Sequence, residues 1–289
     1  TNQNAIAAPS VAYHMDGIFI ASPFSLQTDF IDVERIEVLR GPQGTLFGQN
    51  STGGAINVIS KAPSTSDLEG KTDLTVGNYG LTKTRGSINL PISDSVATRT
   101  SISVTKRDGF SDNIFNGQEL DDADHLSFRT DWLFETSDTS SIRVFAQYFD
   151  ADNNGAAMKG FYDTTPDKRE LSQNTLSKYE LESTVIGAIG EADLGFASLK
   201  ALASWQEDDI YVVRDNDRHN LFHDPSSVSS SAPFYVGVEF NPESQLQETT
   251  TFEVNLISNE AWLGTFDWIV GAFYLDQEIE GHIREFLDD

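Results

Sequence analysis

Several absences limit what this sequence can encode. Cysteine does not occur in its 289 residues, so neither a disulfide framework nor a thiolate metal site can stabilise the fold. Positive charge is scarce, because 19 Lys and Arg residues stand against 45 Asp and Glu residues. The resulting formal net charge of -26 excludes nucleic acid as a natural partner, since a phosphate backbone requires a basic face.

Long apolar runs are also missing. No stretch of about 18 consecutive apolar residues occurs, so we expect no membrane-spanning helix. The opening residues, TNQNAIAAPSVAYH, lack the basic start and the apolar core of a signal peptide. We therefore expect either a cytoplasmic protein or a natural start upstream of Thr1. With 38% hydrophobic and 11% aromatic residues, the chain is still too apolar to be an acidic disordered segment.

Most of the chain alternates apolar and polar residues with period two, the pattern of half-buried β-strands. Several of the predicted strands are long enough to cross a bilayer, which takes roughly 9–11 residues in a tilted strand. The predicted strands cover residues 71–77, 82–90, 96–106, 125–134, 141–150, 181–193, 197–207, 246–256 and 266–274.

The connections between these strands are sorted by length. After a first hairpin at residues 78–80, short ones (91–95, 137–140, 194–196 and 259–265) alternate with long ones (107–123, 151–180 and 208–245). Alternation places all long loops at one end of the sheet, as in transmembrane β-barrels. A soluble jelly roll or propeller is the alternative, although no blade-like repeat is visible. Because a closed barrel of this kind needs an even number of strands, we expect the chain to be a piece of a longer protein.

The stretch from Val33 to Lys61 separates this region from a different N-terminal part. It contains IEVLRGP at 36–42, LFG at 46–48 and GGAINVI at 53–59, and the Asp16-Gly17 pair precedes it inside a predicted strand over residues 11–20. A glycine there indicates a bulge or a sharp bend. In this order, the motifs resemble the plug-domain signature of TonB-dependent outer-membrane receptors.

The resemblance implies a fold and a division of the chain. We expect a mostly β protein: a small α+β plug segment over residues 1–66, and about nine strands of a partial antiparallel transmembrane β-barrel over residues 67–289. The signal peptide, the TonB-contacting segment, the early plug and the later strands of what resembles a 22-stranded plugged barrel would then be missing.

The resemblance also implies a function and a location. We expect TonB-dependent active uptake of a scarce solute, a ferric siderophore first, across the bacterial outer membrane. Energy would come through TonB with ExbB and ExbD, and lipid and lipopolysaccharide would surround the barrel. Uptake of an oligosaccharide or cobalamin, or a non-transporting binding or adhesion barrel, are the alternatives. No catalytic constellation and no cofactor motif is present, so we expect no enzyme.

Two groups of plug residues are candidates for structural roles. Glycine at 41, 48, 53 and 54 would permit positive φ and close backbone approach, as it would in the tight turns of any α+β domain. The resemblance implies plug-to-wall salt bridges for Glu37 and Arg40.

Two plug loops are candidates for cargo contact. The resemblance points to Phe24 and Gln27 in one loop, and to Phe47, Gln49 and Asn50 in the other. Packing of Phe47 against the plug core is an equally weighted alternative.

One segment resembles the first half of a calcium loop. Residues 150–155, DADNNG, place side-chain oxygens at positions 1, 3 and 5 and glycine at 6, but position 12 is Phe161 rather than Glu. A weak calcium site and a simple Asx-rich turn both fit this pattern, and we assign no metal site.

Overall fold

The computed structural model describes residues 10–22, 24–25, 29, 31–42, 51–160, 163–215, 218, 243–261 and 265–283. Its regular elements in these ranges are all β-strands, arranged in three sheets. A helix of the length and apolarity required to cross a membrane is not found there. The expected mostly-β fold is confirmed, whereas the described part of the plug contains strands and no helix in place of the expected α+β arrangement.

The first sheet, here called the plug sheet, has four strands. They are β1 (Val11–Met15), β2 (Ile18–Phe19), β3 (Val33–Arg40) and β4 (Gly54–Ser60), in the spatial order β2-β1-β4-β3. β1 runs parallel to β4, and the other two pairs are antiparallel.

The Asp16-Gly17 pair forms a hairpin turn, so the single strand predicted over residues 11–20 is wrong. Met15 pairs with Ile18, which leaves a two-residue loop. Both loop residues have positive φ, 54° at Asp16 and 88° at Gly17, as a type I′ turn requires. The turn reverses the chain and projects the Asp16 carboxylate from the tip of the hairpin.

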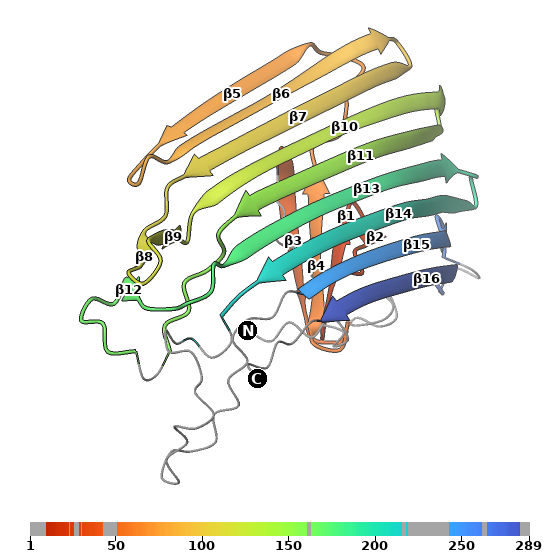
Figure 1. The fold of residues 1–289 in the computed structure, drawn as a ribbon. Helices are drawn as coiled ribbons and strands as arrows, with labels where there is room; N and C mark the ends of the chain where they lie inside the picture. The colour runs from red at the N-terminus through yellow and green to blue at the C-terminus, as the bar shows by residue number, and fades with distance from the viewer. Residues whose placement is uncertain are drawn as a thin grey trace.

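The second sheet, here called the wall sheet, has nine antiparallel strands in the order β16-β15-β14-β13-β11-β10-β7-β6-β5 (Figure 1). Each of the nine predicted strands corresponds to one of them. Their bounds are β5 Glu69–Val76, β6 Thr82–Ser93, β7 Val96–Arg107, β10 Ala123–Ser137, β11 Ser140–Asn153, β13 Lys178–Asp193, β14 Ala197–Val213, β15 Glu243–Ser258 and β16 Ile269–Ile283.

Loop lengths divide the two ends of the wall sheet as expected. The four short turns after β6, β10, β13 and β15 lie at one end, and the long connections lie at the other, together with the β5–β6 hairpin turn (Figure 1). Two of the long connections contain the third sheet, formed by β8 (Ser111–Asn113), β9 (Gln118–Leu120) and β12 (Glu170–Leu171). Strands of two or three residues are too short to show a periodic pattern, so the sequence did not predict this sheet.

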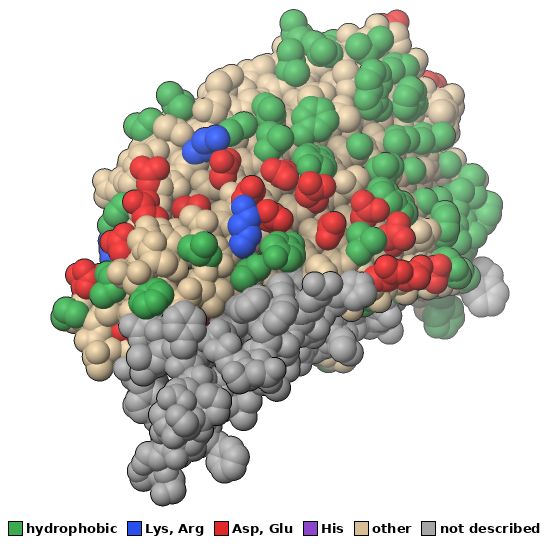
Figure 2. Space-filling model, viewed as in Figure 1, with side chains coloured by type: hydrophobic (Ala, Val, Ile, Leu, Met, Phe, Trp, Pro, Cys, Tyr) green, Lys and Arg blue, Asp and Glu red, His purple; other side chains and the backbone are tan. Residues whose placement is uncertain are grey.

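The wall sheet has two chemically different faces. Apolar side chains such as Ile102, Phe128, Trp132, Val144 and Ile186 are exposed on the face turned away from the plug. Figure 2 shows this face, with apolar side chains gathered toward the short turns and carboxylates closer to the long loops. The opposite face is largely polar and lies against the plug, so it is shielded from solvent there.

The main hydrophobic core joins the plug to the wall. Tyr13, Met15, Ile18, Ile20 and Val58 of the plug pack against wall residues of β11, β13 and β14. These wall residues are Phe145, Val185, Ile189 and Leu202. The plug is therefore seated on the concave face of the wall by apolar burial as well as by charge.

A connecting segment, residues 61–68, runs from the plug sheet to the first wall strand. The domain boundary expected between residues 66 and 67 stays a prediction. The segment is held to the wall by the fully buried Asn89. Its side-chain amide donates to the carbonyls of Ser64 and Asp67, and its oxygen accepts from the Ser64 amide. This end of the plug is therefore attached to β6 by three hydrogen bonds.

Candidate functional site

The contact between plug and wall is the candidate functional site, and a buried cluster of four charges lies within it. The cluster consists of Asp16 from the plug and Arg129, Asp131 and Arg143 from the wall. Arg129 Nη2 lies 2.7 Å from Asp16 Oδ2, and its Nε lies 2.8 Å from Asp131 Oδ2. Arg143 reaches Asp131 at 2.6 Å and Asp16 at 3.5 Å. Two cations and two anions balance, so the cluster is neutral while the plug is seated.

Local structure fixes the position of the Asp16 carboxylate. Its Oδ1 accepts a hydrogen bond from the Ser60 amide at 2.9 Å, which ties the β1–β2 turn to the end of β4. The next amide, Gly17 N, donates to Asn57 Oδ1 at 3.1 Å. The guanidinium of Arg129 lies 4.1 Å from the centroid of the Phe145 ring, in cation–π geometry. The ion pair is therefore preorganised on both sides.

Two further plug aspartates pair with the wall between β6 and β7. Asp29 Oδ2 lies 2.9 Å from Lys83 Nζ and 3.2 Å from the hydroxyl of Ser103. The carboxylate of Asp32 accepts hydrogen bonds from the buried guanidinium of Arg99 and from Ser101. With Asp16, these residues give three ionic attachments along one side of the plug.

The predicted cargo residue Phe24 lies in the plug–wall contact. It is 4% exposed and packs in a cluster with Phe149, Ala151, Leu181 and Ile210 of the wall. The adjacent Ser25 hydroxyl donates to both oxygens of the buried Asp208 carboxylate, at 2.8 and 2.9 Å. Phe24 and Ser25 thus attach this plug loop to β11, β13 and β14.

The other predicted cargo residues, Gln27, Phe47, Gln49 and Asn50, lie outside the described residues, as does Gly48. Cargo contact by these residues and by Phe24 stays a prediction.

Two of the predicted plug glycines have backbone conformations that favour glycine. Gly41 has φ of +86° and Gly54 has φ of +146°. A Cβ at Gly54 would collide with the Leu39 carbonyl oxygen across the β3–β4 pair. Gly53 instead approaches Ser10 closely, because a Cβ there would lie 3.1 Å from its carbonyl oxygen.

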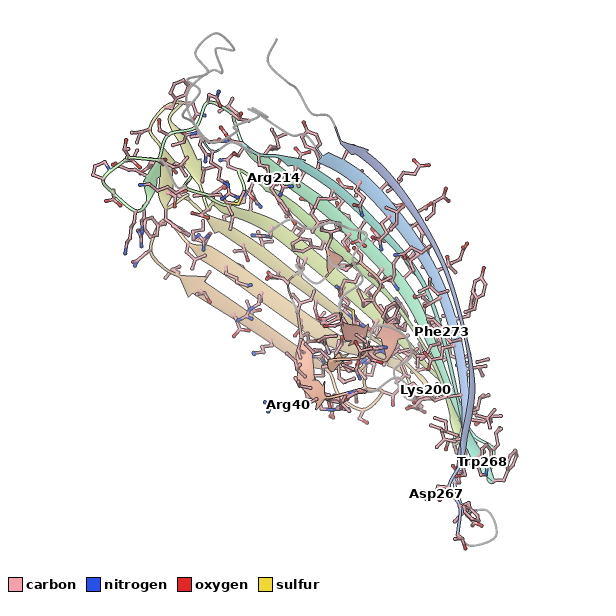
Figure 3. All side chains as sticks on the ribbon, turned by 90° about the horizontal axis from the view of Figure 1, so that it is seen from below. Arg40, Lys200, Arg214, Asp267, Trp268 and Phe273 are labelled. Atoms are coloured by element: carbon pink, nitrogen blue, oxygen red, sulfur yellow. The ribbon has the colours of Figure 1, made fainter. Side chains whose placement is uncertain are left out.

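The predicted anchors Glu37 and Arg40 lie on β3, at the free edge of the plug sheet. Glu37 accepts hydrogen bonds from Arg35 and Asn57, which lower its pKa, and the charge of Lys200 on the wall acts in the same direction. Figure 3 shows Arg40 on the margin of the plug away from Lys200 and Phe273. The described ion pairs to the wall use Asp16, Asp29 and Asp32 of the plug and Lys61 of the connecting segment, so anchoring by Glu37 and Arg40 stays a prediction.

Side chains within the calcium-like segment have local partners. Asp152 forms an ion pair with Lys178, and Asn153 Oδ1 accepts from the Gly155 amide at 2.9 Å. No group of three metal-ligating side chains is present within the part of the chain that the structure describes. The segment behaves as an Asx turn at the end of β11.

Comparison with known proteins gives sequence matches concentrated at the plug. The family model of the TonB-dependent receptor plug domain matches residues 4–55. The pesticin receptor of Yersinia pestis is 42% identical over 55 residues, which are 19% of this chain and 8% of the relative. The metal-pseudopaline receptor CntO of Pseudomonas aeruginosa is 25% identical over 154 residues, which are 50% of this chain and 22% of the relative.

Comparison with solved structures extends the likeness to the wall. The crystal structure of the ferric yersiniabactin uptake receptor FyuA from Yersinia pestis aligns with a TM-score of 0.79 at 19% identity. The alignment covers 97% of this chain and 41% of FyuA, so the two proteins share a fold over this region. The chain spans less than half the length of each of these relatives, all of which are named as receptors.

Proposed function

We propose that this chain, which belongs to the TonB-dependent receptors, is part of a gated transporter that imports ferric siderophores across the bacterial outer membrane. The plug is the gate and the wall sheet is part of the barrel that encloses it. Cargo captured at the long-loop end would pass when the plug leaves its seat, with energy supplied through TonB, ExbB and ExbD.

The observation that carries this proposal is the way the plug is seated. The Arg129–Asp16 pair is 3% and 2% exposed, and it balances a buried charge cluster that only the seated plug completes. Removing one partner from such a buried pair leaves an uncompensated charge, which costs about 3–5 kcal/mol. Opening must break this ion pair together with the apolar contacts between plug and wall, and the proposal assigns that work to an outside source.

The ferric siderophore is proposed as cargo because the relatives include receptors named for such ligands. FyuA is a ferric yersiniabactin receptor, and Fiu of Escherichia coli, 30% identical over 96 residues, is a catecholate siderophore receptor. The alternatives are an oligosaccharide or cobalamin as cargo, and an adhesion barrel that binds without transport. The following experiment distinguishes them from siderophore uptake.

Uptake of radioactive iron from a panel of ferric siderophores should be measured in iron-starved cells that express the complete receptor. We expect accumulation with at least one siderophore in cells that have TonB, and none above background in cells that lack it. Binding to the cell surface should be equal in the two strains, because capture precedes the energised step.

Transport that persists without TonB would contradict the proposal. Binding without energised uptake of any siderophore, cobalamin or oligosaccharide would favour the adhesion barrel. TonB-dependent uptake of cobalamin or an oligosaccharide in place of iron would retain the mechanism and change the cargo.

A further inference from the structure

The inner face of four wall strands carries a continuous row of cations. Residues that pair across neighbouring strands form rows that run across the sheet. On β6, β7, β10 and β11, six successive inward-facing rows each contain one cation, counted from the long-loop end toward the short turns. In that order they are Arg107, Lys83, Arg85, Arg129, Arg99 and Arg143, here called the cation strip.

Carboxylates are fewer than cations on the same face. On β6, β7, β10 and β11 the inward-facing positions include two acids, Asp131 and Glu135. The neighbouring β5 adds Glu69, which lies 3.3 Å from Arg99, and Asp73, which pairs in register with Arg85. The other acids of these strands, Asp124, Asp150 and Asp152, occupy outward positions. A strip of one sign is unexpected in a chain with net charge -26, so it requires a structural or a functional reason.

The plug supplies the missing negative charge. Asp29 pairs with Lys83, Asp32 with Arg99, and Asp16 with both Arg129 and Arg143. Four of the six cations are thus paired with plug carboxylates, and Asp131 of the wall supplies the fourth negative charge that balances them. When the plug leaves, the plug carboxylates leave with it, and the wall retains uncompensated positive charge.

The exposed cations would act together. Lys83 and Arg85 are successive inward residues of β6, about 7 Å apart. The other neighbours lie one row and one or two strands apart, which corresponds to roughly 8–12 Å and is comparable to the Debye length of about 8 Å at physiological ionic strength. Their fields therefore overlap along the strip. A channel lined by charge of one sign focuses that field and concentrates ions of the opposite sign.

From this geometry we infer that the cation strip is a binding track for anionic cargo, covered by the plug aspartates in the closed state and uncovered on opening. The inference rests on the proposed transport function and specifies its substrate class: ferric chelates with net negative charge. Anionic cargo would take the place of the departing aspartates, so the track becomes available only when the passage opens.

Arg85 allows the track to be tested without disturbing the closed plug. It lies in the middle of the strip, its side chain is exposed, and it forms no ion pair with the plug residues that the structure describes. Lys106, which faces outward and pairs with Asp124, provides a matched control for loss of one positive charge.

The experiment measures ion selectivity of the complete receptor in planar lipid bilayers under a potassium chloride gradient. The Asp16→Asn/Asp29→Asn/Asp32→Asn variant should open a conductance that passes chloride several-fold more readily than potassium. Adding Arg85→Gln should reduce this preference by about half, whereas adding Arg85→Lys or Lys106→Gln should leave it unchanged. If the triple variant does not assemble, the single variant Asp29→Asn, whose carboxylate is partly exposed, is measured in the same way.

A conductance that is unselective or prefers potassium would overturn the inference, and so would a preference insensitive to Arg85→Gln. A variant as closed as the unaltered receptor would also overturn it, because the aspartates would then not cover the strip. The measurement needs neither TonB nor a siderophore, so its failure is separable from failure of the proposed uptake.

Discussion

Asp16 of the plug and Arg129 of the wall form a buried ion pair whose nearest oxygen and nitrogen are 2.7 Å apart. The two residues are separated by 113 positions in the chain. Because Asp16 also accepts the Ser60 amide, the pair connects the wall to two different segments of the plug sheet. Its loss should therefore loosen the plug as a unit.

Asp16→Asn in the complete receptor tests this relationship. Asparagine tolerates the positive φ at this position, so the substitution removes charge while preserving the turn. We expect the plug to be destabilised by about 3–5 kcal/mol, because the wall cluster is left with net positive charge. Hydrogen exchange of the β1 amides should accelerate correspondingly, and large antibiotics should leak into the cell.

The matched control is Glu34→Gln, which removes a carboxylate from an exposed pair with Arg35 on the plug edge. Exchange and antibiotic resistance should stay as in the unaltered receptor. If Asp16→Asn behaved like this control, the buried cluster would not hold the plug in place.

Gly187 on β13 tests the closeness of plug and wall. A Cβ at this position would lie 2.5 Å from the Phe145 ring and 2.7 Å from Ile18 Cδ1 of the plug. Gly187→Ala should overpack the contact and destabilise the seated plug by about 1–3 kcal/mol. Antibiotic leakage measures the effect.

Gly190→Ala on the same strand is the control, because its Cβ would meet its nearest neighbour, Ala201, at an ordinary 4.0 Å. Equal leakage from both variants would mean that the strand responds to any alanine, and that the close contact with Ile18 is not responsible.

Phe24 tests whether a buried aromatic attaches the plug loop. Phe24→Ala should cost about 3–5 kcal/mol of plug stability, and Phe24→Leu much less, because leucine refills most of the apolar volume. Protease sensitivity of the plug measures this loss. Unchanged protection with a large fall in siderophore affinity would instead support the predicted role of Phe24 in cargo contact.

His14 predicts a pH dependence of the plug. Burial lowers its pKa from 6.5 to about 4, so the seated plug disfavours the protonated ring. Above pH 6.5 the ring is neutral in both states and contributes no pH dependence. Between pH 6.5 and 4 the unfolded plug binds a proton that the folded plug does not, and stability falls by up to about 3 kcal/mol.

Thermal unfolding of the plug, followed from pH 7.5 to pH 4.5, measures this dependence. His14→Gln carries no titratable group, so its melting temperature should fall less over the same range. Parallel curves for the two proteins would show that other groups cause the acid sensitivity.

The sequence predicted the wall better than the plug contact. Alternation with period two located all nine wall strands, because each has one face toward the plug and one away from it. The end of β16 was missed, since the charged residues after Tyr274 obscured the alternation. Asp16-Gly17 between apolar residues carried a hairpin signal that would have predicted the turn.

The ionic contacts could not be predicted from the sequence in the same way. Asp29 and Lys83 are 54 residues apart and Asp32 and Arg99 are 67 apart, and nothing local marks them as partners. Only strand pairing, which places Lys83, Arg99 and Arg129 on one face, brings them opposite the plug. Of the three attaching aspartates, Asp16 belongs to the pattern that identified the plug, whereas Asp29 and Asp32 lie outside it.

If the plug must leave the wall for cargo to pass, a disulfide between Ser25→Cys and Ser183→Cys should block transport. The two hydroxyl oxygens lie 3.5 Å apart, and no native cysteine in these 289 residues competes. In the oxidised receptor we expect siderophore to bind normally and TonB-dependent uptake to stop, with uptake restored by a reductant. Uptake at the normal rate with the disulfide formed would mean that cargo passes while the plug stays attached to the wall.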